Sequence, residues 1–85
     1  MKYTVRLTRP AQKALDALDG NAFGRIVRAL RGLELDPQPP GVLKLAGEKN
    51  QWRIRVGDWR IVYSVFNCEL VVLILKLGHL REIYR

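Results

Sequence analysis

Apolar and polar residues alternate along two neighbouring segments of the chain, and this alternation predicts a β-hairpin. Every second position of residues 51–56 is apolar: Trp52, Ile54 and Val56. The alternation resumes after Gly57-Asp58 and continues to residue 65. A period of two is typical of strands, and a Gly-Asp pair between two such runs favours a two-residue turn. We therefore expect one strand on each side of this pair.

The first half of the chain predicts a strand followed by two helices. Residues 2–7 alternate and favour the strand, after which Thr8 can cap a helix and Pro10 fits its first turn. Four apolar residues then fall on one helical face: Ala11, Ala14, Leu15 and Leu18. Residues 19–21 (Asp-Gly-Asn) should end this helix and cap the next.

The second helix is amphipathic and should end before Asp36-Pro37, where residues 37–41 form a rigid loop. Its apolar arc holds Phe23, Ile26, Val27, Leu30 and Leu33. Three arginines fall on roughly the opposite arc: Arg25, Arg28 and Arg31. They are interpreted either as a solvated face or as a secondary contact to nucleic acid or to a partner.

The second half of the chain predicts four strands. Residues 42–46 form a short one that ends at Gly47, and residues 48–50 form a polar turn before the hairpin. After a turn at Asn67-Cys68, residues 69–77 are almost continuously apolar, which favours a central strand covered on both faces. Gly78-His79 should break this strand and leave residues 80–85 as a short basic tail. The predicted fold is α+β, in the order β-α-α-β-β-β-β, with two helices over one face of a small, mostly antiparallel sheet in a single domain spanning residues 1–85.

The charge of the chain favours an anionic partner. Fifteen Lys and Arg residues against eight Asp and Glu give a formal charge of +7. In so short a chain this balance favours nucleic acid first, with an acidic protein as the alternative, and both can apply. The single Cys68 excludes an internal disulfide, and neither a signal segment nor a long apolar run is present. We expect a soluble, cytoplasmic protein without a membrane partner.

The hairpin gathers arginines on one face. A two-residue turn pairs Val56 with Trp59, so Arg55 lies opposite Arg60, and Arg53 lies on the same face. Like charges opposite each other are destabilising, and nothing in the hairpin sequence neutralises them. The face is either a solvated sheet surface or a preformed site for phosphates, which guanidinium groups bind through paired N–H donors.

The candidate catalytic residues suit cleavage of RNA by its own 2′-hydroxyl. One His and one Cys do not make a metal-ligand set, and no cofactor motif is present. The candidates are Arg53, Arg55, Arg60, His79, Arg81 and Tyr84. Arginines supply positive charge around the phosphate, and His79 alone has an ordinary pKa near neutrality, which suits a base. The competing interpretation is a structural histidine, with Tyr84 packing the tail instead of stacking on an RNA base.

Three segments together resemble the RelE/ParE superfamily of bacterial and archaeal toxins, and most closely its RelE branch. They are Leu45-x-Gly47, Trp52–Tyr63 and Gly78–Arg85. The resemblance covers the whole chain and implies a microbial-ribonuclease-like fold. It implies a toxin of a type II toxin–antitoxin system that cuts mRNA in the ribosomal A site, and a cognate acidic, RelB-like antitoxin that wraps the toxin. No cofactor is implied.

The resemblance also assigns residues. Arg53 and Arg55 match a basic strand pair, Arg60 a phosphate-binding arginine, Arg81 a tail arginine and Tyr84 a tail tyrosine that stacks on a substrate base. These residues are therefore the expected RNA-binding residues.

The chain departs from its relatives at two positions. Leu80 stands where relatives often have an arginine, and Arg55 stands where some have a lysine assigned as the base. Because arginine does not deprotonate in proteins, His79 is the expected proton carrier. The alternatives are a ParE-like inhibitor of DNA gyrase and a decayed toxin that only binds its antitoxin.

Overall fold

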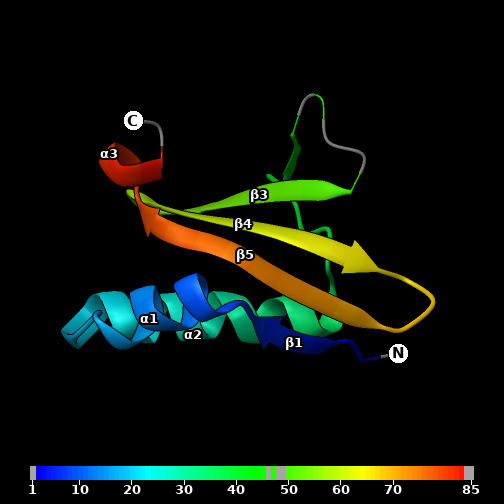
Figure 1. Ribbon diagram of the computed structural model, residues 1–85, viewed down its shortest axis with the longest axis horizontal. Coiled ribbons are helices and arrows are strands. Elements are labelled where there is room, and N and C mark those ends of the chain that lie inside the picture. The colour runs from blue at the N-terminus through cyan, green and yellow to red at the C-terminus, as the bar shows by residue number, and fades with distance from the viewer. Residues whose placement is uncertain (1, 46, 48–49, 84–85) are drawn as a thin grey trace.

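The protein is described by a computed structural model that covers residues 2–45, 47 and 50–83, with side chains as far as residue 81. Within these residues, five strands form one sheet in the order β1-β5-β4-β3-β2 (Figure 1). The elements are β1 (Thr4–Leu7), α1 (Arg9–Asp16), α2 (Gly20–Leu35), β2 (Leu43–Lys44), β3 (Gln51–Val56), β4 (Trp59–Phe66), β5 (Val71–His79) and α3 (Leu80–Ile83). Only the β1–β5 pair among them is parallel. The predicted α+β fold is confirmed.

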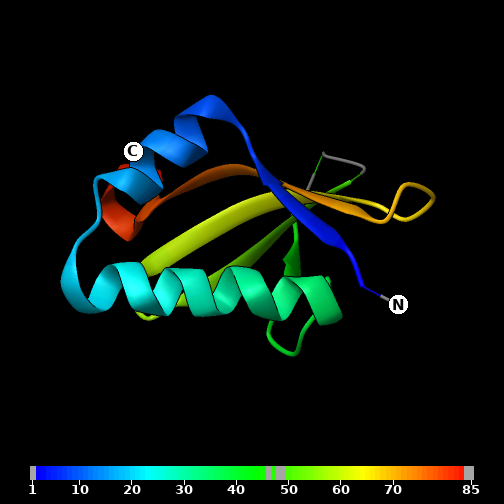
Figure 2. The same ribbon diagram turned by 90° about the horizontal axis from the view of Figure 1, so that it is seen from below.

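The two long helices cover one face of the sheet (Figure 2). The Thr8 side chain accepts a hydrogen bond from the Ala11 amide at 3.3 Å and so caps α1, as predicted. The fully buried Ala11 and Ile26 bring the inner faces of α1 and α2 into the same core, together with Leu33. Apolar side chains at helical spacing therefore explain why both helices dock on the sheet.

Three predicted boundaries before the hairpin differ from the structure. The first strand is shorter than residues 2–7, and α1 ends at Asp16, before the predicted stop at residues 19–21. Asp19 precedes α2 as expected, but its side chain makes no capping hydrogen bond. The strand predicted at residues 42–46 is reduced to Leu43–Lys44, because only these two residues pair with β3, and Ala46 lies outside the described residues.

The hairpin has the predicted register. Val56 pairs with Trp59, Arg55 with Arg60, and Arg53 with Val62. Gly57 has φ +61°, in the left-handed region that a tight hairpin turn needs and that favours glycine. Ile54 is buried in the core, so the neighbouring arginines of β3 point to the other face of the sheet.

Strand β5 differs most from its prediction. It continues through Gly78 to His79, whereas the sequence predicted a break there, because Gly78 pairs with Arg60 and His79 with Trp59. A register shift opposite Val62 and Tyr63 leaves Leu75 as an extra residue between Ile74 and Lys76. The bulge lets Ile74 and Leu77 both reach the core.

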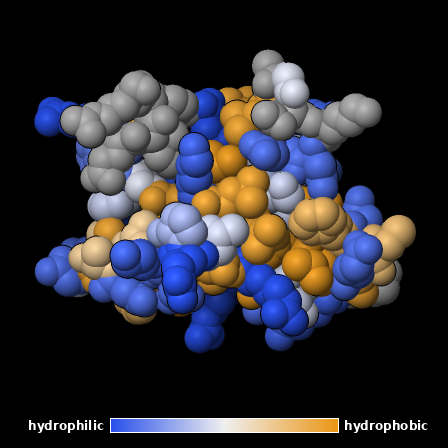
Figure 3. Space-filling model, in the orientation of Figure 1, coloured by the Kyte–Doolittle hydropathy of each residue, from blue (hydrophilic) through white to orange (hydrophobic). Residues whose placement is uncertain are grey.

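The face of β5 away from α1 and α2 is not fully covered, contrary to the prediction for residues 69–77. Val71, Leu73 and Leu75 are half-buried. Figure 3 shows apolar side chains exposed in the middle of the view, where Figure 1 draws β5, with hydrophilic residues around them. The bulge accounts for part of the apolar run, because it places apolar residues at consecutive positions without needing a second layer.

The predicted basic tail begins with a turn of helix. Helix α3 follows β5 and lies on the other side of the sheet from α1 and α2 (Figure 1). None of the helices in the described part of the chain has the length and apolarity needed to span a bilayer.

Candidate functional site

The face of the sheet opposite α1 and α2, here called the open face, carries the predicted arginines. Arg53 and Arg55 reach it from β3, and Arg60 reaches it from β4. Lys76 pairs with Val62 and so lies on the same face. The structure therefore brings the three hairpin arginines together and adds Lys76, which the sequence pattern does not indicate. The bulge in β5 hid this lysine, because alternation along an unbroken strand would place it toward the core.

The carbonyl oxygen of Gly57 is the common acceptor of two of these arginines. Arg55 Nε donates to it at 3.3 Å, and Arg60 Nη1 donates to it at 3.0 Å. Arg60 Nη1 also lies 3.0 Å from the carbonyl oxygen of Trp59. These carbonyl dipoles offset part of the repulsion between the two guanidinium groups. The sequence pattern could not show this, because the acceptors belong to the backbone of the turn.

The exposure of the arginines differs. Arg55 is exposed, whereas Arg53 and Arg60 are half-buried. Arg60 lies beside Gly78 on β5, which has no side chain to compete for the space. The half-buried positions limit the motion of Arg53 and Arg60, and the exposed one keeps Arg55 accessible from solvent. Such an arrangement can bind an anion without a large rearrangement of side chains.

The structure does not bring His79 to the open face. His79 pairs with Trp59, whose ring packs against the core, and directly paired residues share a face of the sheet. The two rings meet edge to face, with centroids 5.6 Å apart and an interplanar angle of 80°. His79 Nδ1 accepts a hydrogen bond from the Arg81 backbone amide at 3.3 Å. A neutral ring in this arrangement carries its proton on Nε2.

The start of the tail is fixed to the hairpin turn. The Leu80 amide donates to the carbonyl oxygen of Asp58 at 2.8 Å, and the following Arg81 is exposed. This contact uses the backbone amide of Leu80, so it does not depend on which side chain stands at position 80. Tyr84, the predicted stacking residue, lies outside the described residues.

Tyr63 lies in the core, away from the open face. Burial, and to a smaller extent the charge of Asp36, raise the pKa of its hydroxyl above the ordinary value. The hydroxyl donates to the carbonyl oxygen of Pro37 at 2.7 Å. Tyr63 therefore anchors the loop after α2 to the sheet. Among the described residues, no group of three or more His, Cys, Asp or Glu side chains is placed to hold a metal ion.

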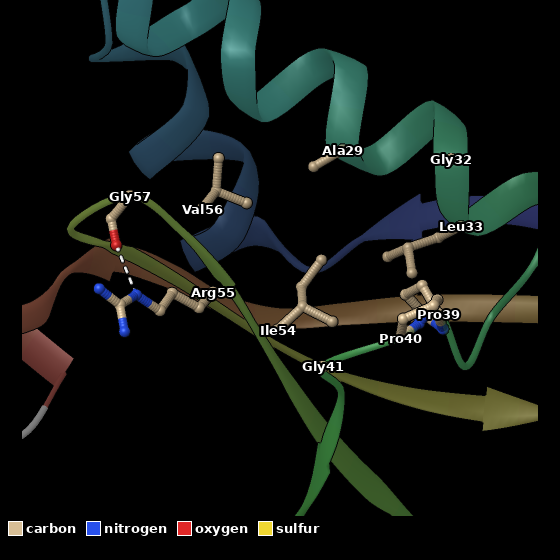
Figure 4. Close-up of a pocket in the computed structure, with 10 residues that line it drawn as sticks. All are labelled: Ala29, Gly32, Leu33, Pro39, Pro40, Gly41, Ile54, Arg55, Val56 and Gly57. Carbon is tan, nitrogen blue, oxygen red and sulfur yellow. Dashed lines mark hydrogen bonds between the residues drawn. The ribbon is translucent and has the colours of Figure 1, made fainter.

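A groove of about 680 Å³ lies between α2, the loop at residues 39–41 and β3 (Figure 4). Its lining is mostly apolar and ends at the hairpin turn: Ala29, Gly32, Leu33, Pro39, Pro40, Gly41, Ile54, Arg55, Val56 and Gly57. Figure 4 shows Ile54 and Val56 pointing toward α2, whereas the guanidinium group of Arg55 lies beside Gly57.

Arg25 is a basic residue near this site that the sequence analysis placed on a solvated or secondary face. Its Nη2 atom lies 2.6 Å from the position that a Cβ atom on Gly57 would occupy. The helical spacing of Arg25, Ala29 and Gly32 places them on the same side of α2 as the groove. That spacing was visible in the sequence, but the side on which the hairpin turn lies was not.

Comparisons with known proteins place the chain among toxins of toxin–antitoxin systems. The family model described as "ParE toxin of type II toxin-antitoxin system, parDE" matches residues 5–84. The comparison with curated proteins gave no match.

Solved structures of RelE proteins share the fold. A chain of the archaeal RelE–RelB complex from Pyrococcus horikoshii is 34% identical with a TM-score of 0.81, over 93% of this chain and 96% of that one. A chain of the RelBE2 toxin–antitoxin complex from Mycobacterium tuberculosis is 27% identical with a TM-score of 0.82, over 93% and 92%. The isolated RelE toxin of E. coli is 22% identical with a TM-score of 0.80, over 91% and 83%, and shows similarity of fold alone.

Proposed function

The chain belongs to the ParE toxin family of type II toxin–antitoxin systems and is RelE-like in structure, and we propose that it cuts mRNA on the ribosome. The observation that carries this proposal is the pair of arginines on the open face, Arg55 and Arg60, held by one carbonyl oxygen. By the resemblance to RelE-like toxins, Arg60 matches a phosphate-binding arginine and Arg55 belongs to a basic strand pair.

The proposed reaction is attack by the 2′-hydroxyl of RNA on the adjacent phosphorus. The 2′-hydroxyl gives its proton to a base as a bond forms between the 2′-oxygen and phosphorus. The bond to the 5′-oxygen of the next nucleotide breaks, and that oxygen takes up a proton from an acid. The products are a 2′,3′-cyclic phosphate and a 5′-hydroxyl. Negative charge builds up on the pentavalent phosphate, where Arg53, Arg55 and Arg60 stabilise it.

The proton transfers need groups other than the arginines. Arginine keeps its proton, so Arg55 stabilises charge and does not act as the base. His79 faces away from the open face and its Nδ1 atom already accepts a hydrogen bond. Arg81 adds charge from the tail, and Tyr84 is the proposed stacking residue. Groups of the ribosome or the RNA can supply the proton transfers that His79 does not.

The proposed partners are the ribosomal A site, its mRNA and an acidic, RelB-like antitoxin, all in the cytoplasm. The similar chains from Pyrococcus horikoshii and Mycobacterium tuberculosis come from complexes of a toxin with an antitoxin. The formal charge of +7 suits both RNA and an acidic protein. An antitoxin segment rich in Asp and Glu would neutralise the toxin by covering the open face.

The match to the ParE toxin model favours a second candidate, inhibition of DNA gyrase. The two candidates differ in what the open-face arginines do. Gyrase inhibition requires no phosphate chemistry, and so it leaves mRNA intact. A toxin that has lost its activity and only binds its antitoxin would show neither effect.

Primer extension on mRNA after brief induction separates these functions. We expect new 5′ ends inside translated codons with the wild-type protein. Replacing Arg55 or Arg60 by Ala should lower the cleavage rate by about 10²–10³-fold, the usual loss when one donor to a transition-state oxyanion is removed. Because Arg55 is exposed, Arg55→Ala should change the melting temperature little.

Arg31→Ala is the matched control, because Arg31 is exposed on α2 and the variant loses the same charge. It should cleave at the wild-type rate. If mRNA stays intact and the protein inhibits supercoiling by purified gyrase, the second candidate replaces the proposed function. If the protein neither inhibits growth nor cleaves mRNA, antitoxin binding is the one function that remains.

A further inference from the structure

Arg25 reaches the hairpin turn from the side of the sheet opposite the open face. It is exposed on α2, and its Cζ and Nη1 atoms both lie 3.2 Å from the position that a Cβ atom on Gly57 would occupy. Glycine leaves room for this contact, and a side chain at position 57 would displace the guanidinium group, the flexible end of Arg25. Gly57 is also in the left-handed region, with φ +61°.

Three guanidinium groups therefore surround one glycine. Arg55 and Arg60 donate to its carbonyl oxygen from one side, and Arg25 lies against its α-carbon from the other. Within the part of the chain that the structure describes, none of the three forms an ion pair with a carboxylate. Cations gathered without an anionic partner repel one another, and a bound anion relieves that repulsion.

We propose that Arg25 holds a second phosphate of the RNA strand, next to the phosphate held by Arg55 and Arg60. This inference rests on the proposed function, and it extends the binding site around the tip of the hairpin. A single phosphate can contact one side of the turn, whereas a phosphodiester chain carries a phosphate at every nucleotide and can contact both. Arg25 is thus an RNA-positioning residue.

The groove beside the turn favours an RNA strand, rather than an isolated anion, as the ligand. It begins at Gly57 and continues between α2 and β3, lined by small and apolar residues such as Ala29 and Val56. Its volume of about 680 Å³ provides space for part of a nucleotide next to the phosphate. The cation that lines it, Arg55, and its apolar surface match the two chemical parts of a nucleotide.

The experiment measures the affinity of each variant for a short single-stranded oligoribonucleotide over a range of salt concentrations. For a single strand, each phosphate contact contributes about −0.7 to the slope of log affinity against log salt concentration. We expect Arg25→Ala to reduce the magnitude of the slope by about 0.7. Arg25→Lys keeps the charge and should keep most of the slope.

Arg28→Ala is the matched control, since Arg28 is exposed on the same helix and the variant loses the same charge. Its slope should stay at the wild-type value. If Arg25→Ala behaves like Arg28→Ala while Arg55→Ala and Arg60→Ala lose affinity, the inference fails and the proposed function stands. If all four variants bind alike, the proposed RNA site itself fails. Weaker binding of an acidic antitoxin with unchanged RNA binding would assign Arg25 to a protein interface and overturn the inference.

Discussion

At the scale of single residues, the contacts of His79 limit the chemistry that it can perform. Its ring lies edge to face with Trp59, and its Nδ1 atom accepts the Arg81 amide. His79 directly precedes α3, so this hydrogen bond is of the kind that an N-cap side chain makes. In a neutral imidazole, only one ring nitrogen has a lone pair that can accept a proton. In His79 this nitrogen is Nδ1, and it already accepts the hydrogen bond from the Arg81 amide. These contacts favour a residue that positions Arg81 over one that accepts a proton.

Asparagine and alanine at position 79 distinguish the two roles. Asparagine can accept the Arg81 amide, so His79→Asn should cleave mRNA within about tenfold of the wild-type rate, with an unchanged pH profile. His79→Ala loses the cap, worth about 0.5–2 kcal/mol, and should lower both the stability and the rate. Single-turnover cleavage on programmed ribosomes, measured against pH, provides both quantities.

A proton-transfer role for His79 predicts a different result. Both variants would then lose about 10²–10⁴-fold in rate, the usual contribution of a general acid or base. Any pH dependence of the rate that comes from residue 79 would also disappear in both variants. That outcome would contradict the positioning role and support the interpretation drawn from the sequence.

At the scale of elements, the bulge in β5 determines which residues face the core. Ile74 pairs with Tyr63 and Lys76 pairs with Val62, so Leu75 is extra in the ladder. Its carbonyl oxygen accepts a hydrogen bond from the Thr8 hydroxyl at 3.0 Å, which ties the bulge to the start of α1. Regular alternation from Ile74 would instead bring Lys76 into the core.

Two single-residue deletions test this account. Deletion of Leu75 removes the bulge but leaves Lys76 and Leu77 on their present faces. We expect a cooperative melt with a loss of about 1–3 kcal/mol, which includes the hydrogen bond from Thr8. Deletion of Leu77 reverses the faces of Gly78 and His79 and removes a buried side chain, so it should unfold the protein. Circular dichroism against temperature would measure both, and the opposite order of stability would refute the role of the bulge.

The elements also show how far the sequence could predict the fold and the site. The hairpin register followed from alternation and one Gly-Asp pair, so the positions of Arg53, Arg55 and Arg60 were predictable. The bulge was not, because an apolar run hides a shift of one residue. The face of His79 depended on whether β5 continued past Gly78, and local sequence favoured a break. The contact between Arg25 and Gly57 required knowledge of how α2 crosses the sheet.

At the scale of the whole molecule, four of the fifteen Lys and Arg residues lie where the proposed partners would meet the protein. Arg53, Arg55, Arg60 and Lys76 share the open face, and α1 and α2 occupy the other. An acidic antitoxin and RNA would therefore compete for one surface. Competition of this kind makes neutralisation reversible and dependent on the concentration of antitoxin.

Protection from an arginine-specific reagent tests this competition. In the free protein, Arg55 and the exposed Arg31 of α2 should both react. In the complex with its antitoxin, Arg55 and Arg60 should be protected, because the antitoxin segment covers the open face. Arg31 serves as the internal reference for reagent strength. Equal reactivity of Arg55 in the free and bound protein would rule out neutralisation by covering the open face.

The parallel pairing of β1 with β5 has a consequence for the timing of toxicity. Val5 pairs with Val72, so β1 can join the sheet only after β5 has been synthesised. During translation, β1 cannot find its neighbour until β5 has left the ribosomal exit tunnel, and contacts between such distant residues form slowly. A nascent chain therefore cannot complete the sheet before β5 has emerged, and until then the ribosome that synthesises the protein is not exposed to a finished toxin.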